Sequence, residues 1–304
     1  MKFNIVFMGT PDFAVPALAK ISQSLLTIKQ VYSQPPKKSN RGMKLEKSPI
    51  HTFAENNNLP VRTPSKLQDD YDFFKSLNID LAIVVAYGQI ISKEFLQLSK
   101  HGFLNIHASI LPSWRGAAPI QRSIMSQDLF TGISIMKIVE KLDSGPVLLT
   151  EKINLNLNST AGEVESQLAT LGANKITEAI DLIKNNKANF IEQNNEQATY
   201  AKKITKEDEK INWSHDAKKI IAQIHGLNPR PGAYFEYKGE KIKIWKASYS
   251  EENGNAGTVI SNSLQVACGT SSLIIEELQR PGKKIQKSKE FLLGFSIPKE
   301  TQLN

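Results

Sequence analysis

The first half of the chain alternates short apolar runs with segments of helical periodicity. Continuous apolar runs bounded by turn signals are typical of strands buried on both faces of a parallel sheet. The expected strands cover residues 3–8, 31–33, 80–86, 102–107, 132–139 and 146–155. Residues 161–186 instead carry apolar side chains at helical spacing. This alternation predicts an α/β domain built on a mostly parallel sheet.

Proline and glycine positions mark where these elements begin and end. Thr10-Pro11 and Ser48-Pro49 each combine a capping side chain with a proline suited to the first helical turn, so a helix should follow each pair. Residues 34–49 hold two adjacent prolines, a glycine and five basic residues, which predicts an exposed loop.

The pattern changes in the last third of the chain. Residues 189–210 are polar and lysine-rich, which suggests a linker after a first domain at 1–188. One helix near 214–225 and several short extended stretches follow. The stretches cover 233–237, 241–247, 257–260, 264–267 and 273–278. Such short strands separated by turns predict a small β-barrel-like domain over residues 211–304.

Composition narrows the class of protein. Hydrophobic residues make up 40% of the 304 residues and charged residues 22%, which excludes a disordered chain. No apolar run approaches the roughly 18 residues that a membrane span needs, and the first residues do not resemble a signal peptide. Cys268 is the single cysteine, and the five histidines lack ligand-like spacing. We therefore expect a cytoplasmic protein, without membrane attachment, that needs no metal.

The net charge of +8 is unevenly distributed. Residues 29–47 hold six Lys and Arg against one acid, and residues 201–304 hold 17 against 12. Confined positive charge favours a polyanionic partner such as a nucleic acid, because phosphate contacts release counterions. A solvated surface that only keeps the protein in solution is the alternative. A dinucleotide site is disfavoured, since the turn after the first strand, Gly9-Thr10-Pro11-Asp12, has only one glycine.

The densest group of chemically capable residues lies at 102–122. Asn105 and His107 are two apart on an expected strand and should face the same side. Asp143 lies in a turn between two later strands, where a carboxylate has no obvious packing role. An amide and an imidazole could stabilise the oxyanion formed when an amine attacks an acyl or formyl carbon, and the carboxylate could orient the imidazole or help to move the amine proton. Taken alone, an Asn-x-His pattern is more often structural, with Asn105 capping a loop and His107 a satisfied core histidine.

Five segments together resemble the formyltransferase family that uses 10-formyltetrahydrofolate. They are GTPDFAVPAL near the start, QPPKKSNRGMKL at 34–45, VAYGQIIS at 85–92, LNIHASILPSWRGAAPIQR at 104–122 and LDSGPVL at 142–148. The continuation from Trp114 to Ile120 is similar to members that act on tRNA. The resemblance implies a Rossmann-like catalytic domain followed by an OB-like barrel that contacts the tRNA backbone.

The resemblance also implies roles for particular residues. Asn105, His107 and Asp143 match the catalytic residues of the family. The residues expected to bind the folate co-substrate are Val85, Tyr87, Gly88, Gln89, Ile90, Ser109, Ile110, Leu111 and Pro112. The residues expected to contact tRNA are Lys37, Lys38, Arg41 and Lys44. The implied reaction is formyl transfer from 10-formyltetrahydrofolate to the α-amino group of methionyl initiator tRNA, in translation initiation, by a monomer.

Two other functions remain open from the sequence. A formyltransferase or formyl-folate hydrolase that acts on a small molecule would share Asn105, His107 and Asp143, but it would not need the basic segment or the second domain. An RNA-binding protein without enzymatic activity would explain the charge, but not the coexistence of these three residues.

Overall fold

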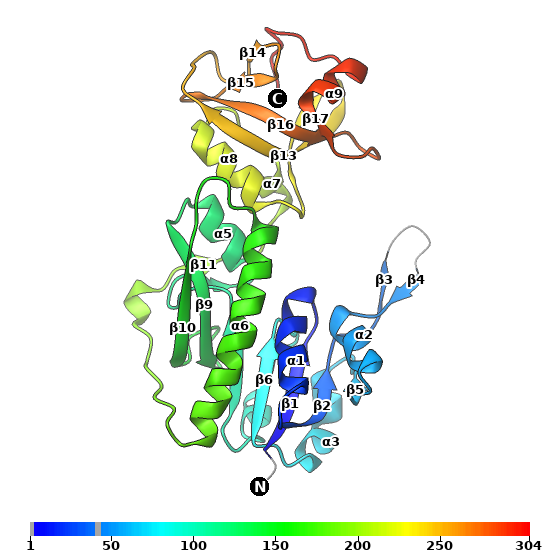
Figure 1. Ribbon diagram of the computed structural model, residues 1–304, viewed down its shortest axis with the longest axis vertical. Coiled ribbons are helices and arrows are strands. Elements are labelled where there is room, and N and C mark those ends of the chain that lie inside the picture. Colours follow the sequence, from blue (N-terminus) through cyan, green and yellow to red (C-terminus); the bar gives the residue numbers. More distant parts are fainter. Residues whose placement is uncertain (1–2, 40–43) are drawn as a thin grey trace. The chain divides into compact units, whose positions relative to one another are not determined.

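The computed structural model describes residues 3–39 and 44–304. The chain divides into two compact units (Figure 1). The N-terminal unit comprises Met1–Gly116, Gly132–Lys152 and Glu165–Tyr200. The C-terminal unit comprises Ala117–Thr131, Ile153–Val164 and Ala201–Asn304. The domain limits expected at 188 and 210 stay a prediction.

The N-terminal unit is built on a seven-stranded sheet in the order β10-β9-β7-β6-β1-β2-β5. Its strands are β1 (Asn4–Gly9), β2 (Thr27–Tyr32), β5 (Val61–Arg62), β6 (Leu81–Val85), β7 (Phe103–His107), β9 (Phe130–Lys137) and β10 (Val147–Asn154). The strands from β7 to β5 pair in parallel, and β9 runs antiparallel to β7. The mostly parallel α/β sheet expected from the sequence is therefore confirmed.

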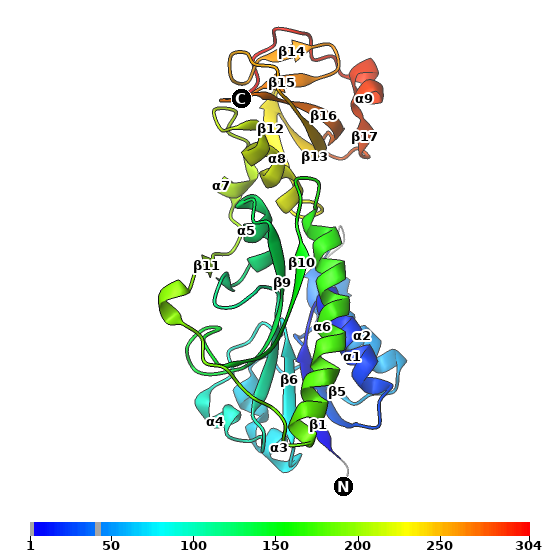
Figure 2. The ribbon, with the colours of Figure 1, turned by 60° about the vertical axis from the view of Figure 1, so that its left-hand side comes forward.

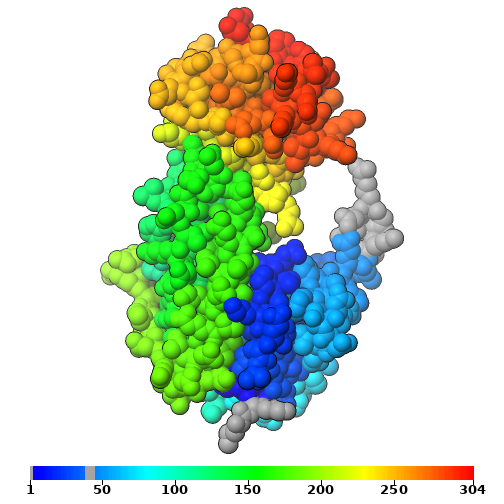
Figure 3. Space-filling model, in the orientation of Figure 1, coloured from blue at the N-terminus to red at the C-terminus, as the bar shows by residue number. Residues whose placement is uncertain are grey.

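Helices cover both faces of this sheet. They are α1 (Val15–Ser22), α2 (Pro49–Asn56), α3 (Tyr71–Ser76), α4 (Lys93–Leu96) and the long α6 (Ala161–Lys184). Helices α1, α2 and α6 lie on one face and α4 lies on the other (Figure 2). In the space-filling view α1 and α6 lie side by side (Figure 3). The Lys20 ammonium of α1 donates to the Asn174 side-chain oxygen of α6. The apolar strands are thus buried on both sides, as a parallel sheet requires.

Local sequence explains where the helices begin. The Ser48 hydroxyl accepts a hydrogen bond from the His51 backbone N–H at 3.0 Å, and Pro49 occupies the first helical turn of α2. This capping arrangement is the one that the sequence predicted, because a Ser side chain can satisfy an N–H group that the helix leaves free. The start expected at Thr10-Pro11 differs: a short 3₁₀ turn at Asp12–Ala14 comes first without a side-chain cap, and α1 follows with another proline, Pro16, in its first turn. The expected capping role of Thr10 is wrong, because its hydroxyl donates to the Tyr87 carbonyl oxygen instead.

Side chains on the two faces of β7 have different neighbours. Phe103 packs in a cluster with Phe74 of α3 and Phe95 of α4. Ile106, of the opposite parity, lies against Gly172 of α6. Because side chains alternate along a strand, Asn105 and His107 share the face of Phe103 and not that of α6.

The C-terminal unit is β-rich, as expected, and its sheet is antiparallel. Its elements are α5 (Pro119–Met125), α7 (Lys206–Glu209), α8 (Ala217–Gly226), β12 (Ala233–Tyr237), β13 (Glu240–Ser250), β14 (Val259–Ser261), β15 (Gln265–Ala267), β16 (Ser272–Gln279), β17 (Gln286–Lys287) and α9 (Ser288–Gly294). The sheet runs β12-β13-β16-β15-β14, with β17 paired to β16. Helix α8 packs its Ile220, Ile221 and Ile224 side chains into the core of this unit. Closure of the sheet into a barrel stays a prediction.

The basic segment at 34–49 differs in part from the expected loop. It contains β3 (Lys37–Ser39) and β4 (Lys44–Glu46), which pair as an antiparallel hairpin that projects from the N-terminal unit beside α2 (Figure 1). Lys37 is paired in register with Glu46, and opposite charges at facing positions stabilise a pair of strands. The proline and glycine content, which predicted a loop, gives no sign of this pairing. Across the described ranges 3–39 and 44–304, the structure contains no helix that combines the length and the apolar character of a transmembrane segment.

The close approach of α6 to β7 generates a first prediction. A Cβ atom at position 172 would lie 2.7 Å from Ile106 Cγ2. We expect Gly172→Ala to lower the free energy of unfolding by about 1–3 kcal/mol through overpacking, although alanine is intrinsically the better helix former by about 1 kcal/mol. Urea denaturation measures the change.

A matched background identifies the cause. In an Ile106→Ala protein, which lacks the Cγ2 atom, Gly172→Ala should be neutral or stabilising. An equal loss of stability in both backgrounds would contradict the close-approach explanation.

Candidate functional site

The candidate site lies where the parallel strands end. The backbone of Asn105 is paired with Val84 of β6 on one side and with Met136 of β9 on the other. The Asn105 side chain is half-buried, and no group within the described part of the chain hydrogen-bonds to its amide. The backbone of Asn105 is therefore held on both sides by neighbouring strands, and its side-chain amide is available to donate a hydrogen bond to a ligand.

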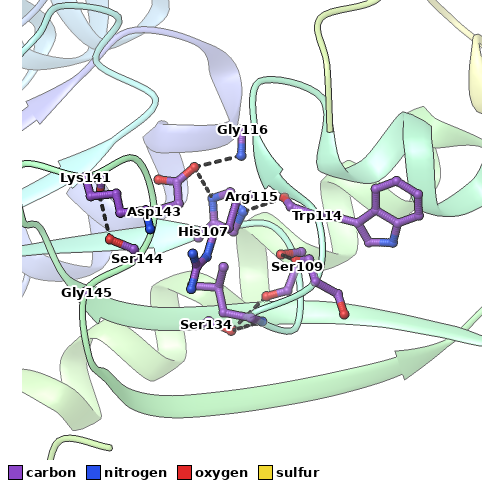
Figure 4. A network of polar contacts seen from close by, with 12 residues as sticks. His107, Ser109, Trp114, Arg115, Gly116, Ser134, Lys141, Asp143, Ser144 and Gly145 are labelled. Carbon is purple, nitrogen blue, oxygen red and sulfur yellow. Dashed lines mark hydrogen bonds and ion pairs between the residues drawn. The ribbon is translucent and has the colours of Figure 1, made fainter. Parts of the chain in front are cut away.

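His107 lies at the end of the same strand and is 5% exposed. Its Nε2 atom is 3.0 Å from the carbonyl oxygen of Trp114, and its Nδ1 atom is 3.8 Å from Asp143 Oδ2 (Figure 4). Because a carbonyl oxygen can only accept, Nε2 carries a proton and donates a hydrogen bond to the Trp114 carbonyl oxygen. The other ring nitrogen is left facing the carboxylate.

Asp143 is brought to His107 by the turn between β9 and β10. Its backbone has a φ of 45°, in the left-handed region that Asp tolerates better than most residues. Its Oδ2 atom accepts a hydrogen bond from the Gly116 backbone N–H at 2.8 Å (Figure 4). No described residue hydrogen-bonds to Oδ1, so this oxygen remains available as an acceptor. The structure thus brings together the imidazole and carboxylate that the sequence placed 36 residues apart.

Gly145 explains why this turn can approach β9 so closely. A Cβ atom at position 145 would lie 1.9 Å from the backbone oxygen of Lys137. The Lys137 N–H also donates to the Pro146 carbonyl oxygen at 2.9 Å. Any side chain at 145 would push the turn away from the strand, and Asp143 would move with it.

The segment after β7, which was expected to bind the folate co-substrate, is rigidly held. The buried Ser134 hydroxyl donates to the carbonyl oxygen of Ser109 at 2.8 Å and accepts from the backbone N–H of Leu111 at 3.1 Å. The Ser109 hydroxyl donates to the Ser113 carbonyl oxygen at 2.6 Å. The side chains of Ile110 and Pro112 are half-buried, whereas those of Ser109 and Leu111 are buried. These contacts fix the backbone beside His107.

The residues expected to bind folate after β6 divide into two groups. Val85 and Tyr87 are buried in the core, where burial raises the pKa of the Tyr87 phenol. Gly88, Gln89 and Ile90 line a hollow of about 410 Å³ together with Gln34, Phe95 and residues 65–68. Ile90 is 93% exposed, and Gln89 hydrogen-bonds to the Pro64 carbonyl oxygen and the Leu67 N–H. The second group therefore presents surface to a ligand, while the first group shapes the strand end.

Thr10 joins the ends of two strands at this edge. Its hydroxyl donates to the Tyr87 carbonyl oxygen at 2.7 Å, and the Gln34 side-chain amide donates to the same oxygen at 3.3 Å. The turns after β1 and β6 are thereby tied to each other. Among the described residues no group of three or more His, Cys, Asp or Glu side chains forms a possible metal site.

The basic residues expected to contact tRNA lie on the β3–β4 hairpin, as far as the structure describes them. Lys37 and Lys38 belong to β3, and Lys44 belongs to β4. The Lys37 side chain is exposed. Arg41 lies outside the described residues.

Sequence reasoning missed a buried polar group next to the site. Arg115 is 1% exposed, and its guanidinium donates to the side-chain oxygens of Gln193 and Asn195. Both acceptors of this guanidinium thus belong to neutral amide side chains. Gln193 and Asn195 lie in the polar segment expected to be a linker, and composition alone carried no signal for their contacts.

Family models cover most of the chain. The model described as formyl transferase matches residues 1–180, and the model described as formyl transferase, C-terminal domain, matches residues 203–296. The chain is 50% identical to a methionyl-tRNA formyltransferase of Pelagibacter ubique, over 100% of this chain and 99% of that protein. It is 42% identical to a methionyl-tRNA formyltransferase of Caulobacter vibrioides, over 99% of each.

Solved structures share the fold at lower identity. An N-formyltransferase from Helicobacter canadensis superposes with a TM-score of 0.68 at 20% identity, over 90% of this chain and 99% of that one. HypX from Aquifex aeolicus also reaches a TM-score of 0.68, at 15% identity, over 98% of this chain and 49% of that one. With both family models in order along the chain and close relatives over its full length, the chain belongs to the formyl transferase family, among the methionyl-tRNA formyltransferases.

Proposed function

We propose that this enzyme transfers the formyl group of 10-formyltetrahydrofolate to the α-amino group of methionyl initiator tRNA, for translation initiation. The observation that carries the proposal is the arrangement of a free amide, Asn105, on the same strand face as an imidazole, His107, that meets the Asp143 carboxylate at 3.8 Å. The relatives over the full chain length support tRNA as the acceptor more than a small molecule. We further propose that it acts as a cytoplasmic monomer.

Each group has a role that its surroundings allow. When the amine nitrogen attacks the formyl carbon, the formyl oxygen becomes negative, and the unpartnered Asn105 amide can donate a hydrogen bond to it. A well-placed donor to such an oxyanion contributes roughly 3–4 kcal/mol to catalysis. Because the amide is held on a central strand, little reorganisation is needed during the reaction.

The amine loses a proton during the transfer, and the departing donor nitrogen gains one. The free Oδ1 of Asp143 can accept a hydrogen bond from the amine, while Oδ2 stays bonded to the Gly116 N–H. His107 donates a hydrogen bond from Nε2 to the Trp114 carbonyl oxygen, so its Nδ1 atom can share a proton with Asp143. The two side chains together provide a path for the proton to leave the attacking nitrogen.

The hollow beside β6 suits a flat, partly apolar ring such as the pterin of the folate donor. Ile90 offers an exposed apolar surface there. Gly88 has a φ of 84°, a conformation that favours glycine, and a glycine places no side chain at the rim. We propose a folate donor because the chain belongs to the formyl transferase family and because formyl transfer needs a formyl donor.

A formylation assay tests the proposed function directly. We expect the full chain with 10-formyltetrahydrofolate to convert methionyl initiator tRNA to its formyl form, measured by mass spectrometry of the amino acid released from the tRNA. Glycinamide ribotide and an amino-sugar nucleotide serve as alternative acceptors. Formylation of a small acceptor in preference to the tRNA would overturn the assignment of the substrate.

Asn105 generates the second prediction. Asn105→Ala should lower kcat by about 10²–10³-fold and leave the KM for both substrates within about threefold, because the donor acts on charge that develops in the transition state. The half-buried side chain has no hydrogen-bond partner among residues 3–39 and 44–304, so thermal unfolding should shift little. Near-normal turnover in this variant would remove Asn105 from the mechanism.

Ile90 generates the third prediction. Ile90→Ala should raise the KM for the folate donor about tenfold, which corresponds to about 1.4 kcal/mol of lost apolar contact, without changing the free energy of unfolding. Leu25→Ala is the control, because Leu25 is equally exposed and lies after α1, away from the hollow. Equal effects of the two substitutions would exclude a role for Ile90 in donor binding.

Lys37 generates the fourth prediction. Lys37→Ala should raise the KM for tRNA and leave the KM for the donor unchanged. The slope of log activity against log salt concentration should fall by about one, as expected for the loss of one phosphate contact. Lys29→Ala on β2 is the matched control, since Lys29 is also exposed but lies outside the hairpin. An unchanged salt slope in the Lys37 variant would argue against contact between the hairpin and the tRNA.

A further inference from the structure

The polar segment that follows α6 is bound to the N-terminal unit at both ends. Ile191 and Val147 exchange two backbone hydrogen bonds of 2.9 and 2.8 Å. Thr199 accepts from the Arg115 backbone N–H at 2.9 Å through its carbonyl and from the Trp114 N–H at 2.8 Å through its hydroxyl. We refer to residues 191–199 as the strap. One end is thus fixed to β10, and the other is fixed to Trp114 and Arg115. Trp114 carries the carbonyl oxygen that accepts from His107.

Gln193 uses every hydrogen-bonding position of its side chain. Its oxygen accepts from Arg115 Nε at 3.1 Å and from Arg115 Nη2 at 2.7 Å. Its amide nitrogen donates to the carbonyl oxygens of Asp143 at 2.9 Å and of Gly145 at 2.7 Å. A single side chain therefore joins a buried guanidinium to the turn that carries the catalytic carboxylate.

Arg115 gives this bridge its strength. Hydrogen bonds from a charged donor are stronger than those between neutral groups, and loss of an acceptor would leave part of a buried cation unpaired. Within the described residues, no carboxylate lies within ion-pair distance of this guanidinium. The Gln193 oxygen is consequently held in place by a charge, and the orientation of its amide nitrogen toward the turn follows.

Asp143 is then restrained from two directions. Its carboxylate is bonded to the Gly116 N–H, next to Arg115 in the chain, and its backbone carbonyl is bonded to Gln193. The left-handed backbone at Asp143 is a conformation that an unrestrained turn would leave readily. Without the bonds from Gln193, the Gly116 N–H and the contacts within the turn and at its ends would be left to hold the carboxylate beside His107.

We propose that Gln193 is a positioning residue for Asp143, so that this one residue of the strap contributes to catalysis in addition to connecting two parts of the chain. The proposal rests on the proposed function in so far as it concerns formyl transfer. Its structural part, that Gln193 holds the turn at 141–146, stands independently.

Gln193→Glu separates the two ends of the bridge. A glutamate has the same shape and still accepts from Arg115, now with an opposite charge, so the buried guanidinium keeps its partner. It has no N–H to offer, however, and it would place an oxygen against the carbonyl oxygens of Asp143 and Gly145. Asn195→Asp is the matched control, because it places the same charge on the same guanidinium without contact to the turn.

We expect Gln193→Glu to lower kcat by about 10–100-fold, the loss that a misplacement of about 1 Å can produce, with the KM for both substrates within about threefold. Within 141–146, the residues that have a backbone N–H, which excludes Pro146, should exchange hydrogen faster in this variant. Asn195→Asp should stay within about threefold of the unsubstituted enzyme and leave the exchange unchanged. If Gln193→Glu does not fold, Gln193→Asn retains the amide but is too short to reach both partners, and the same results are expected.

Three results would overturn the inference. The first is a kcat within threefold of the unsubstituted enzyme for Gln193→Glu, and the second is unchanged exchange at 141–146. The third is an equal loss in Asn195→Asp, which would assign the effect to the added charge. If the unsubstituted enzyme does not formylate methionyl-tRNA, the proposed function fails, and the exchange comparison alone decides whether Gln193 holds the turn.

Discussion

The contact between the Asp143 carboxylate and the His107 ring is the interaction on which the site depends. The two groups come from separate parts of the sheet, one from the end of β7 and one from the turn after β9, and they meet at 3.8 Å. Their approach requires Gly145, since a side chain there would collide with the β9 backbone. It also requires the Gly116 N–H, which holds one carboxylate oxygen and leaves the other free.

The fold supplies a rigid base for this contact. β7 is bonded on both sides, so Asn105 and His107 cannot shift without disrupting the centre of the sheet. Ser134 fixes the segment that follows β7 through two hydrogen bonds in the interior. Asn105 and His107 therefore lie on a strand that is held on both sides, while the groups proposed to bind the tRNA lie on a projecting hairpin.

Much of this arrangement follows from the sequence, for identifiable reasons. The run that becomes β6 is apolar at every position and buried on both faces, so it is easily recognised. Asn105 and His107 are two apart on a strand, and spacing alone predicts their common face. The hairpin within 34–49 was not predicted, because its strands have three residues each and are stabilised partly by charge pairing. Gln193 could not be found either, because polarity that usually marks a solvated segment here satisfies a buried arginine.

The hydrogen bonding of Gln193 has a consequence for the evolution of this enzyme. The position demands an oxygen that can receive two N–H groups and, at the same reach, a nitrogen that can give two protons. Of the twenty genetically encoded amino acids, only glutamine combines these features in a side chain of this length. Any substitution at position 193 would therefore break at least one of these four hydrogen bonds, and this restriction arises from the geometry of the protein rather than from contact with any substrate.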